Sequence, residues 1–80
     1  MEELKLSANK AVGTKAVLRA LKAGDAVRVY VARDIDTLLY QKFTRACEEV
    51  RVPVKRVESS KELGRVCSLT IGCAAAALLK

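Results

Sequence analysis

Segments that favour β-strands alternate along this chain with segments that favour helices, and this alternation restricts its fold more than any other feature. Residues 27–31 (VRVYV) are rich in valine and alternate with a period of two, which predicts a strand. A second strand is predicted over residues 52–57, which a proline opens, and a brief one over residues 10–12. Such alternation is typical of α/β domains, in which helices pack against a sheet.

Two helices of ordinary length are predicted between these strands. Residues 14–23 (TKAVLRALKA) are strong helix formers and end at Gly24, a residue favoured just after a helix C-terminus. The second helix ends at about Val50 and repeats apolar residues at helical spacing: Leu39, Phe43, Ala46, Cys47 and Val50. The candidate N-terminal caps are Asp34 or Asp36 for this second helix and Ser59 or Ser60 for a later, shorter one.

The remaining segments complete the predicted order. A short helix over residues 61–67 is expected to break around Gly64, and residues 2–8 are also expected to be helical. Residues 73–80 (CAAAALLK) are ambiguous, because alanine favours a helix whereas the alternation of strands and helices along the chain predicts a buried strand. We predict a strand there. Residues 1–80 then form one α/β domain of order β-α-β-α-β-α-β, a three-layer α/β/α sandwich.

The charge balance favours a polyanionic partner. Lys and Arg number 15 against 9 Asp and Glu, so the net charge is 15 − 9 = +6. Such a balance suits nucleic acid or an acidic membrane face, although solubility explains many basic small proteins equally well. No apolar run approaches the roughly 20 residues of a membrane helix, and the start Met1-Glu2-Glu3 is acidic, unlike a signal peptide. We therefore expect a cytoplasmic protein without membrane contact.

The residues for catalysis or metal binding are missing from the sequence. Without histidine, a Ser or Cys nucleophile lacks its usual base, and Cys47, Cys67 and Cys73 form no C-x-x-C pair. We expect these cysteines to be buried as small apolar side chains. Asp34 and Asp36 could act as a carboxylate pair, but helix capping is the favoured interpretation. We predict no enzymatic activity, metal, cofactor or small-molecule substrate.

The turn Gly13-Thr14-Lys15 is the first candidate binding feature. Lys15 in the first turn of a helix opposes the macrodipole, whose N-terminal end is already positive. The arrangement becomes favourable when a phosphate binds there, because the free N–H groups and the ammonium group then contact it together and glycine lets the backbone come close to it. Arg19 and Lys22 extend the positive stripe along the same helix face. The alternative is an ordinary solvated face.

The loop at residues 68–72 is the second candidate feature. Leu69 and Ile71 flank Thr70 between the helix expected to break at Gly64 and the turn glycine Gly72, where their side chains can be exposed. Exposed, they could stack on an unpaired base or wedge between strands. The alternative is that both side chains pack into the core.

Three segments in fixed order carry a family resemblance: GTKAVLRALKAG, VYVARDIDT and ACEEVRVPVKRVESSKELGRVCSLTIGCAAAAL. They resemble the kink-turn-binding ribosomal protein family that includes archaeal L7Ae, eukaryotic L30e and short bacterial members, and the resemblance covers nearly the whole chain. Its most specific parts are the G-[AT]-[NK]-x-x-x-[KR] turn and helix and the L-G-[RK]-x-C-x-[LIV] segment. The resemblance implies a four-stranded mixed sheet and binding of the kink-turn, an RNA duplex bent sharply at a bulge beside tandem G·A pairs.

The resemblance also implies which residues meet the RNA. The helix start meets the G·A pairs, an acidic residue at the position of Asp36 binds a bulged base, and the apolar loop covers the flipped-out bases. The implied RNA-binding set is Gly13, Thr14, Lys15, Arg19, Lys22, Asp36, Glu58, Ser60, Leu69, Thr70, Ile71 and Gly72. Archaeal members carry Asn-Glu where this chain has Lys15-Ala16, which shifts the balance towards phosphate contacts. Many members also have a basic residue where Ser60 stands.

The expected function is therefore recognition of structured RNA by a monomeric, ribosome-associated or riboswitch-associated protein. Such a protein stabilises the kinked form of the RNA because it binds that form more tightly than the extended one. A protein-interaction module of the same fold is the main alternative, and a nonspecific binder of polyanions is the second.

Overall fold

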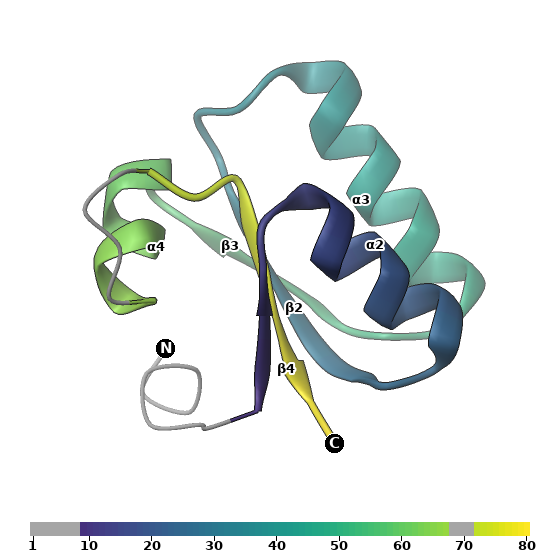
Figure 1. The fold of residues 1–80 in the computed structure, drawn as a ribbon. Coiled ribbons are helices and arrows are strands. Elements are labelled where there is room, and N and C mark those ends of the chain that lie inside the picture. The colour runs from purple at the N-terminus through teal and green to yellow at the C-terminus, as the bar shows by residue number, and fades with distance from the viewer. Residues whose placement is uncertain (1–8, 68–71) are drawn as a thin grey trace.

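The computed structural model describes residues 9–67 and 72–80, and the described elements follow the predicted order (Figure 1). The elements are β1 (Lys10–Val12), α2 (Thr14–Ala23), β2 (Ala26–Ala32), α3 (Thr37–Glu49), β3 (Val54–Val57), α4 (Ser60–Val66) and β4 (Ala75–Leu79). The helix predicted at residues 2–8 lies outside the described residues, and so do Leu69, Thr70 and Ile71 of the predicted loop. Among the described residues, no helix combines the length and the apolar character needed to cross a membrane.

The four strands form one mixed sheet of order β1-β4-β2-β3. Strand β2 runs parallel to β3, and β4 runs antiparallel to both of its neighbours, β1 and β2. The alanine-rich segment is thus a central strand, as predicted from the rhythm of the chain and against alanine propensity. Ala75, Ala76 and Ala77 are fully buried, because a central strand covered on both faces has no solvent side.

The sheet lies between two layers of helices, which confirms the predicted three-layer sandwich (Figure 1). Helices α2 and α3 cover one face, where Val29 and Val31 of β2 pack with Phe43. Helix α4 covers the other face, where Tyr30 and Ala32 pack with Leu63. Alternate residues of β2 therefore feed two separate cores, as the period of two requires. All three cysteines are buried with free thiols, which also agrees with the prediction.

Three details differ from the sequence prediction. Helix α4 is continuous through Gly64, which is buried, because packing against the sheet and N-terminal capping outweigh the cost of about 1 kcal/mol for a helical glycine. Strand β3 begins at Val54 instead of residue 52, although the carbonyl of Pro53 still accepts a hydrogen bond from the Val29 N–H at 3.0 Å. Val50 is 42% exposed because it lies at the C-cap of α3, beyond the turn that packs.

Candidate nucleic-acid interface

Most of the described candidate residues meet at one end of the sheet. Backbone hydrogen bonds join the segments there: Gly13 N–H to Ala75 O at 3.0 Å, Ala32 N–H to Ala74 O at 2.9 Å, and Arg33 N–H to Val57 O at 2.8 Å. The ends of β1, β2 and β3 and the start of β4 therefore lie side by side (Figure 1). We call this end the rim and define it as residues 13–15, 33–36, 58–60 and 72–75.

Helix α2 begins at the rim with an uncapped N-terminus. Gly13, its N-cap residue, has φ 97° and ψ 162°, no side chain caps the helix, and no acidic residue stands in the first turn. The first helical bond runs from Val17 N–H to Gly13 O at 3.0 Å, so the N–H groups of residues 14–16 have no acceptor within the helix. A Cβ at Gly13 would meet no atom within 4 Å. The helix end is therefore open to an approaching anion.

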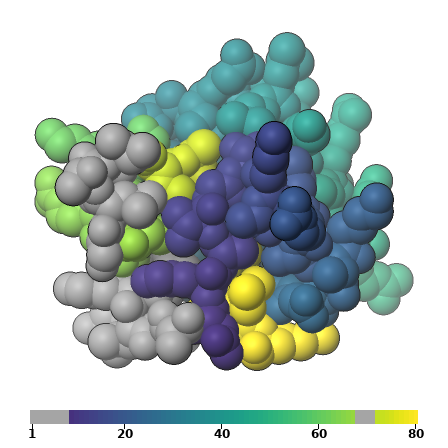
Figure 2. All heavy atoms as spheres, in the orientation of Figure 1, coloured from purple at the N-terminus to yellow at the C-terminus, as the bar shows by residue number. Residues whose placement is uncertain are grey.

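The basic stripe predicted on α2 lies on its exposed face. Lys15, Arg19 and Lys22 are exposed, whereas Val17, Ala20 and Leu21 are buried against the sheet and α3. Figure 2 shows the outward surface of α2 in the middle of this view, beside β1 and the C-terminal end of β4. Lys22 stands in the last turn, about 10 Å along the axis from Lys15 at 1.5 Å per residue, where a cation also complements the helix dipole. Lys22 therefore lies away from the rim.

The start of α4 is held at the rim by a side chain from the end of β2. Asp34 Oδ1 accepts a hydrogen bond from the Ser60 N–H at 2.8 Å, and its Oδ2 accepts one from the Ser60 hydroxyl at 3.3 Å. Ser59 caps the same helix by accepting from the Glu62 N–H at 3.1 Å. A Cβ at Gly72 would lie 3.1 Å from Ser60 Oγ, so the chain passes close over this serine. Ser60 is thus fixed from two sides.

The two predicted acidic residues of the rim are both exposed. Asp36 caps α3, since its Oδ1 accepts a hydrogen bond from the Leu38 N–H at 2.7 Å, and this identifies it as the cap of the long helix. Asp34, the other candidate cap, serves α4 instead. The Glu58 carboxylate lies 3.7 Å from the Arg33 guanidinium, in a pair whose side chains are 80% and 57% exposed. So exposed a pair contributes little stability and leaves Arg33 available to a stronger anion.

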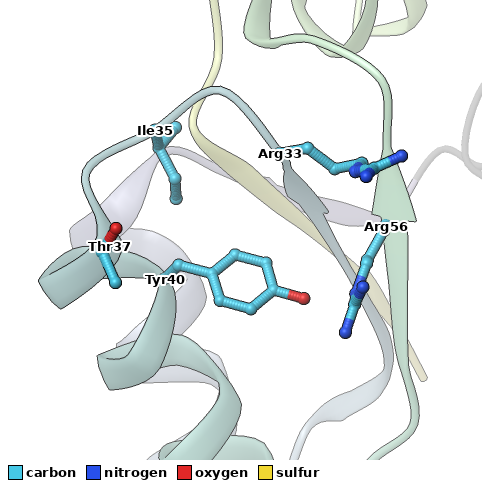
Figure 3. A pocket seen from close by; sticks show the side chains of 5 residues that line it. All are labelled: Arg33, Ile35, Thr37, Tyr40 and Arg56. Atoms are coloured by element: carbon cyan, nitrogen blue, oxygen red, sulfur yellow. The ribbon is translucent and has the colours of Figure 1, made fainter.

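A pocket beside the rim contains residues that sequence reasoning did not select. It has a volume of about 230 Å³, and its lining residues come from the end of β2, the start of α3 and the edge strand β3: Arg33, Ile35, Thr37, Tyr40 and Arg56 (Figure 3). The hydroxyl end of Tyr40 points toward Arg56, whose guanidinium carbon lies 5.7 Å from the ring centroid. Guanidinium groups and an aromatic face together suit a planar, negatively charged group.

The pocket could not be identified from local sequence patterns. Arg33 follows a strand end, which marks it as a rim residue. Arg56, however, reaches the pocket only because β3 pairs in parallel with β2 in a register that places it beside Val31. Its alternation with Val57, which is buried on the α4 side, then directs Arg56 to the α3 side.

The fold places this chain among the three-layer α/β/α sandwich proteins with a four-stranded mixed sheet. Residues 2–80 match the sequence profile of the Ribosomal protein L7Ae/L30e/S12e/Gadd45 family, and the chain belongs to that family. The resemblance noted in the sequence is thereby confirmed at the level of the family.

Individual relatives agree with this membership. The chain is 47% identical over 69 residues to RNA-binding protein YbxF of Geobacillus stearothermophilus, an alignment that covers 86% of this chain and 84% of the relative. It is 35% identical over 68 residues to an RNA-binding protein of Caldanaerobacter subterraneus, which covers 85% and 83%. Among solved structures, the Giardia lamblia 15.5kD RNA binding protein superposes with a TM-score of 0.86 at 26% identity, over 99% of this chain and 66% of that one.

Proposed function

We propose that this protein binds kink-turn RNA through the rim and the exposed face of α2, and that it acts by binding alone. The observation that carries the proposal is the open N-terminus of α2, where free N–H groups, Gly13 and Lys15 lie at the same end of the sheet as the arginine pocket. The relatives named as RNA-binding proteins support the choice of RNA as the polyanion.

Helix α2 supplies the phosphate contacts in this proposal. The N–H groups of residues 14–16, which have no acceptor within the helix, and the positive end of the helix dipole attract a phosphate, and Gly13 lets the backbone approach closely. Lys15 and Arg19 then contact phosphates along the groove, and Lys22 does so at the far end of the helix. Because Lys15-Ala16 replaces the Asn-Glu of archaeal members, α2 contributes affinity more than base selectivity.

The pocket beside the rim supplies the contact to an unstacked nucleotide. The Tyr40 ring and Ile35 offer apolar surface to a base, and Arg33 and Arg56 offer positive charge to its phosphate. Asp36 and Glu58, both exposed near the pocket, can accept hydrogen bonds from base amino groups. Ser60 and Gly72 hold the neighbouring edge in place. The sequence prediction that Leu69, Thr70 and Ile71 cover flipped-out bases completes the proposed interface.

A kinked RNA fits this proposed interface because its backbone phosphates and its extruded bases lie close together in space. A bent duplex presents backbone phosphates and extruded bases within one protein's reach, whereas an extended duplex keeps its bases stacked. The protein therefore stabilises the kinked form by differential affinity. Ribosomal RNA and riboswitches are the proposed sources of such RNA.

The proposal is tested by titrating a kink-turn RNA and the same duplex without its bulge at several salt concentrations. Tight binding to the kink-turn alone is expected, and Lys15→Ala and Arg19→Ala should each reduce the log–log salt slope by about one. Arg45→Ala is the matched control, because Arg45 is exposed on α3, outside the rim, the pocket and α2, and its loss should leave affinity unchanged. Equal binding to both RNAs would indicate a nonspecific polyanion binder, and no binding to either would indicate a protein-interaction module.

A further inference from the structure

The pocket beside the rim has two ends of different chemistry. Arg33 follows β2 and Arg56 lies in β3, and these two strands pair in parallel, so both guanidinium groups line the same pocket. Figure 3 shows the two guanidinium groups on the side toward which the Tyr40 hydroxyl points. Ile35 and Thr37 lie at the other end of the Tyr40 ring. The pocket therefore has a cationic end and an opposite, largely uncharged end.

The positive charge at the cationic end is only weakly compensated within the protein. Among the described residues, no carboxylate pairs with Arg56, and its contact with the Tyr40 ring at 5.7 Å is close to the outer limit of about 6 Å for a cation–π interaction. Arg33 has only the exposed pair with Glu58 at 3.7 Å, which contributes little. Two cations that share one pocket repel each other, and an anion bound between them relieves this repulsion.

The volume and the uncharged end restrict the ligand further. At about 230 Å³, the pocket is smaller than the roughly 300–1,000 Å³ of sites that enclose drug-sized molecules, so it suits one nucleotide and excludes a dinucleotide. Ile35 and Tyr40 are half-buried and offer apolar surface to a base. The exposed Thr37 hydroxyl can donate or accept a hydrogen bond at the polar edge of that base. A planar base and a phosphate joined by a sugar match the two ends together.

We propose that this pocket binds a free nucleoside 5′-monophosphate, and that the bound nucleotide competes with RNA. The phosphate lies between Arg33 and Arg56, and the base lies against Tyr40 and Ile35. Binding of the nucleotide does not depend on the proposed function. The competition does rest on it, because the pocket then receives either the free nucleotide or an unstacked nucleotide of the RNA. Kink-turn affinity therefore falls as the concentration of free nucleotide rises.

Nucleotide binding is tested by following the backbone amide signals of the isotope-labelled protein in two-dimensional NMR during titration with adenosine 5′-monophosphate. We expect saturable shifts concentrated in residues 33–40 and 54–58. Adenosine and inorganic phosphate should each bind at least about tenfold more weakly, because each fills only one end of the pocket. If either binds as tightly as the nucleotide, the proposed ligand class is wrong. Absence of saturation, or shifts confined to residues 13–19, would overturn the proposed site.

Arginine variants test the cationic end of the pocket. Arg33→Ala and Arg56→Ala should each weaken nucleotide binding about fivefold, a loss kept modest by the solvent exposure of both side chains. Arg45→Ala is the matched control, because Arg45 is an exposed arginine of α3 outside the pocket, and it should bind the nucleotide as the wild type does. Thermal unfolding confirms that each variant is folded. Equal losses in all three variants would indicate general attraction by positive charge and contradict the site.

Kink-turn binding in the presence of the nucleotide tests the competition. Ionic strength is held constant, because RNA affinity depends on salt. Adenosine 5′-monophosphate at about ten times its dissociation constant should weaken kink-turn affinity at least about fivefold. In the double variant Arg33→Ala, Arg56→Ala, the nucleotide should have no effect on the affinity that remains. A nucleotide that occupies the pocket without changing RNA affinity would refute the competition. If the wild-type protein binds no kink-turn RNA, the proposed function fails, and the NMR titration still decides the nucleotide site.

Discussion

Gly13 and Gly24 bracket α2 and allow the open helix end to be tested separately from helix stability. Gly13 has φ 97° and ψ 162°, a region open essentially to glycine alone, whereas Gly24 has φ 77° and ψ 17°, the left-handed helical region. A Cβ at either position would meet no atom within 4 Å. The cost of alanine is therefore backbone strain in both cases, without a steric clash.

The two strains differ in size. Alanine in the left-handed region costs about 1–2 kcal/mol, and in the region of Gly13 about 1–3 kcal/mol. At 4–8 °C per kcal/mol for a domain of this size, Gly13→Ala should lower the Tm by roughly 4–24 °C and Gly24→Ala by roughly 4–16 °C. Asparagine tolerates the left-handed region, so Gly24→Asn should recover part of the loss, whereas Gly13→Asn should not.

Only Gly13→Ala should weaken RNA binding, because its new methyl group stands where a phosphate would approach the N–H groups of α2. We expect roughly a tenfold loss of kink-turn affinity, equivalent to about 1.4 kcal/mol, measured well below the Tm of every variant. Gly24→Ala should bind as the wild type does. Equal affinity losses in both variants would attribute the effect to general destabilisation and refute the reasoning, as would a Gly13→Ala protein of unchanged Tm.

Two further predictions concern stability. Asp34→Ala removes the acceptor of two hydrogen bonds from Ser60 and should lower the free energy of unfolding by about 1–2 kcal/mol, measured by thermal unfolding. Asp34→Asn keeps a capping oxygen and should lose much less stability. Equal losses in the two variants would mean that Asp34 does not act as a cap. Burial raises the pKa of the Cys47 thiol from 9.0 to about 11, so the unfolded chain ionises first and stability falls as the pH rises from about 9 to about 11. Urea titrations across this range should show that Cys47→Ala lacks about 2–3 kcal/mol of the decline, and identical pH profiles would contradict the assignment.

The order of elements was predictable because each carries a strong local signal. The alternating valines of β2 and the alanine- and leucine-rich α2 follow the two periodicities of regular structure. The prediction of strand β4 needed the order of the other elements as well as local propensity. Its alanines favour a helix locally and form a strand because the sheet needs a central strand at that position. Gly64 shows the limit of local signals: its low helix propensity predicted a break, and packing of Leu63 on the sheet kept α4 intact.

The candidate site was partly predictable because it is built from the ends of elements. Glycine, aspartate and serine are concentrated at helix termini for reasons of backbone geometry and hydrogen bonding, and the same residue types led to Gly13, Asp36 and Ser60. Their meeting at one rim depends on pairing between distant segments, which no local rule contains. Asp34, for example, binds Ser60 across 26 positions of the chain.

That long-range bond shows how a small domain can hold a candidate binding surface on loops. The segments after β2 and β3 are short, and parallel pairing of these strands places Asp34 beside the first turn of α4. The helix end thereby obtains its acceptor, and the loop after β2 obtains a fixed position from which Arg33 faces the pocket. One carboxylate thus joins the start of α4 to the loop that carries Arg33. Because Asp34 is exposed, solvent screening limits the strength of its hydrogen bonds to Ser60. The close approach of Gly72 to the Ser60 side chain also restricts the position of Ser60.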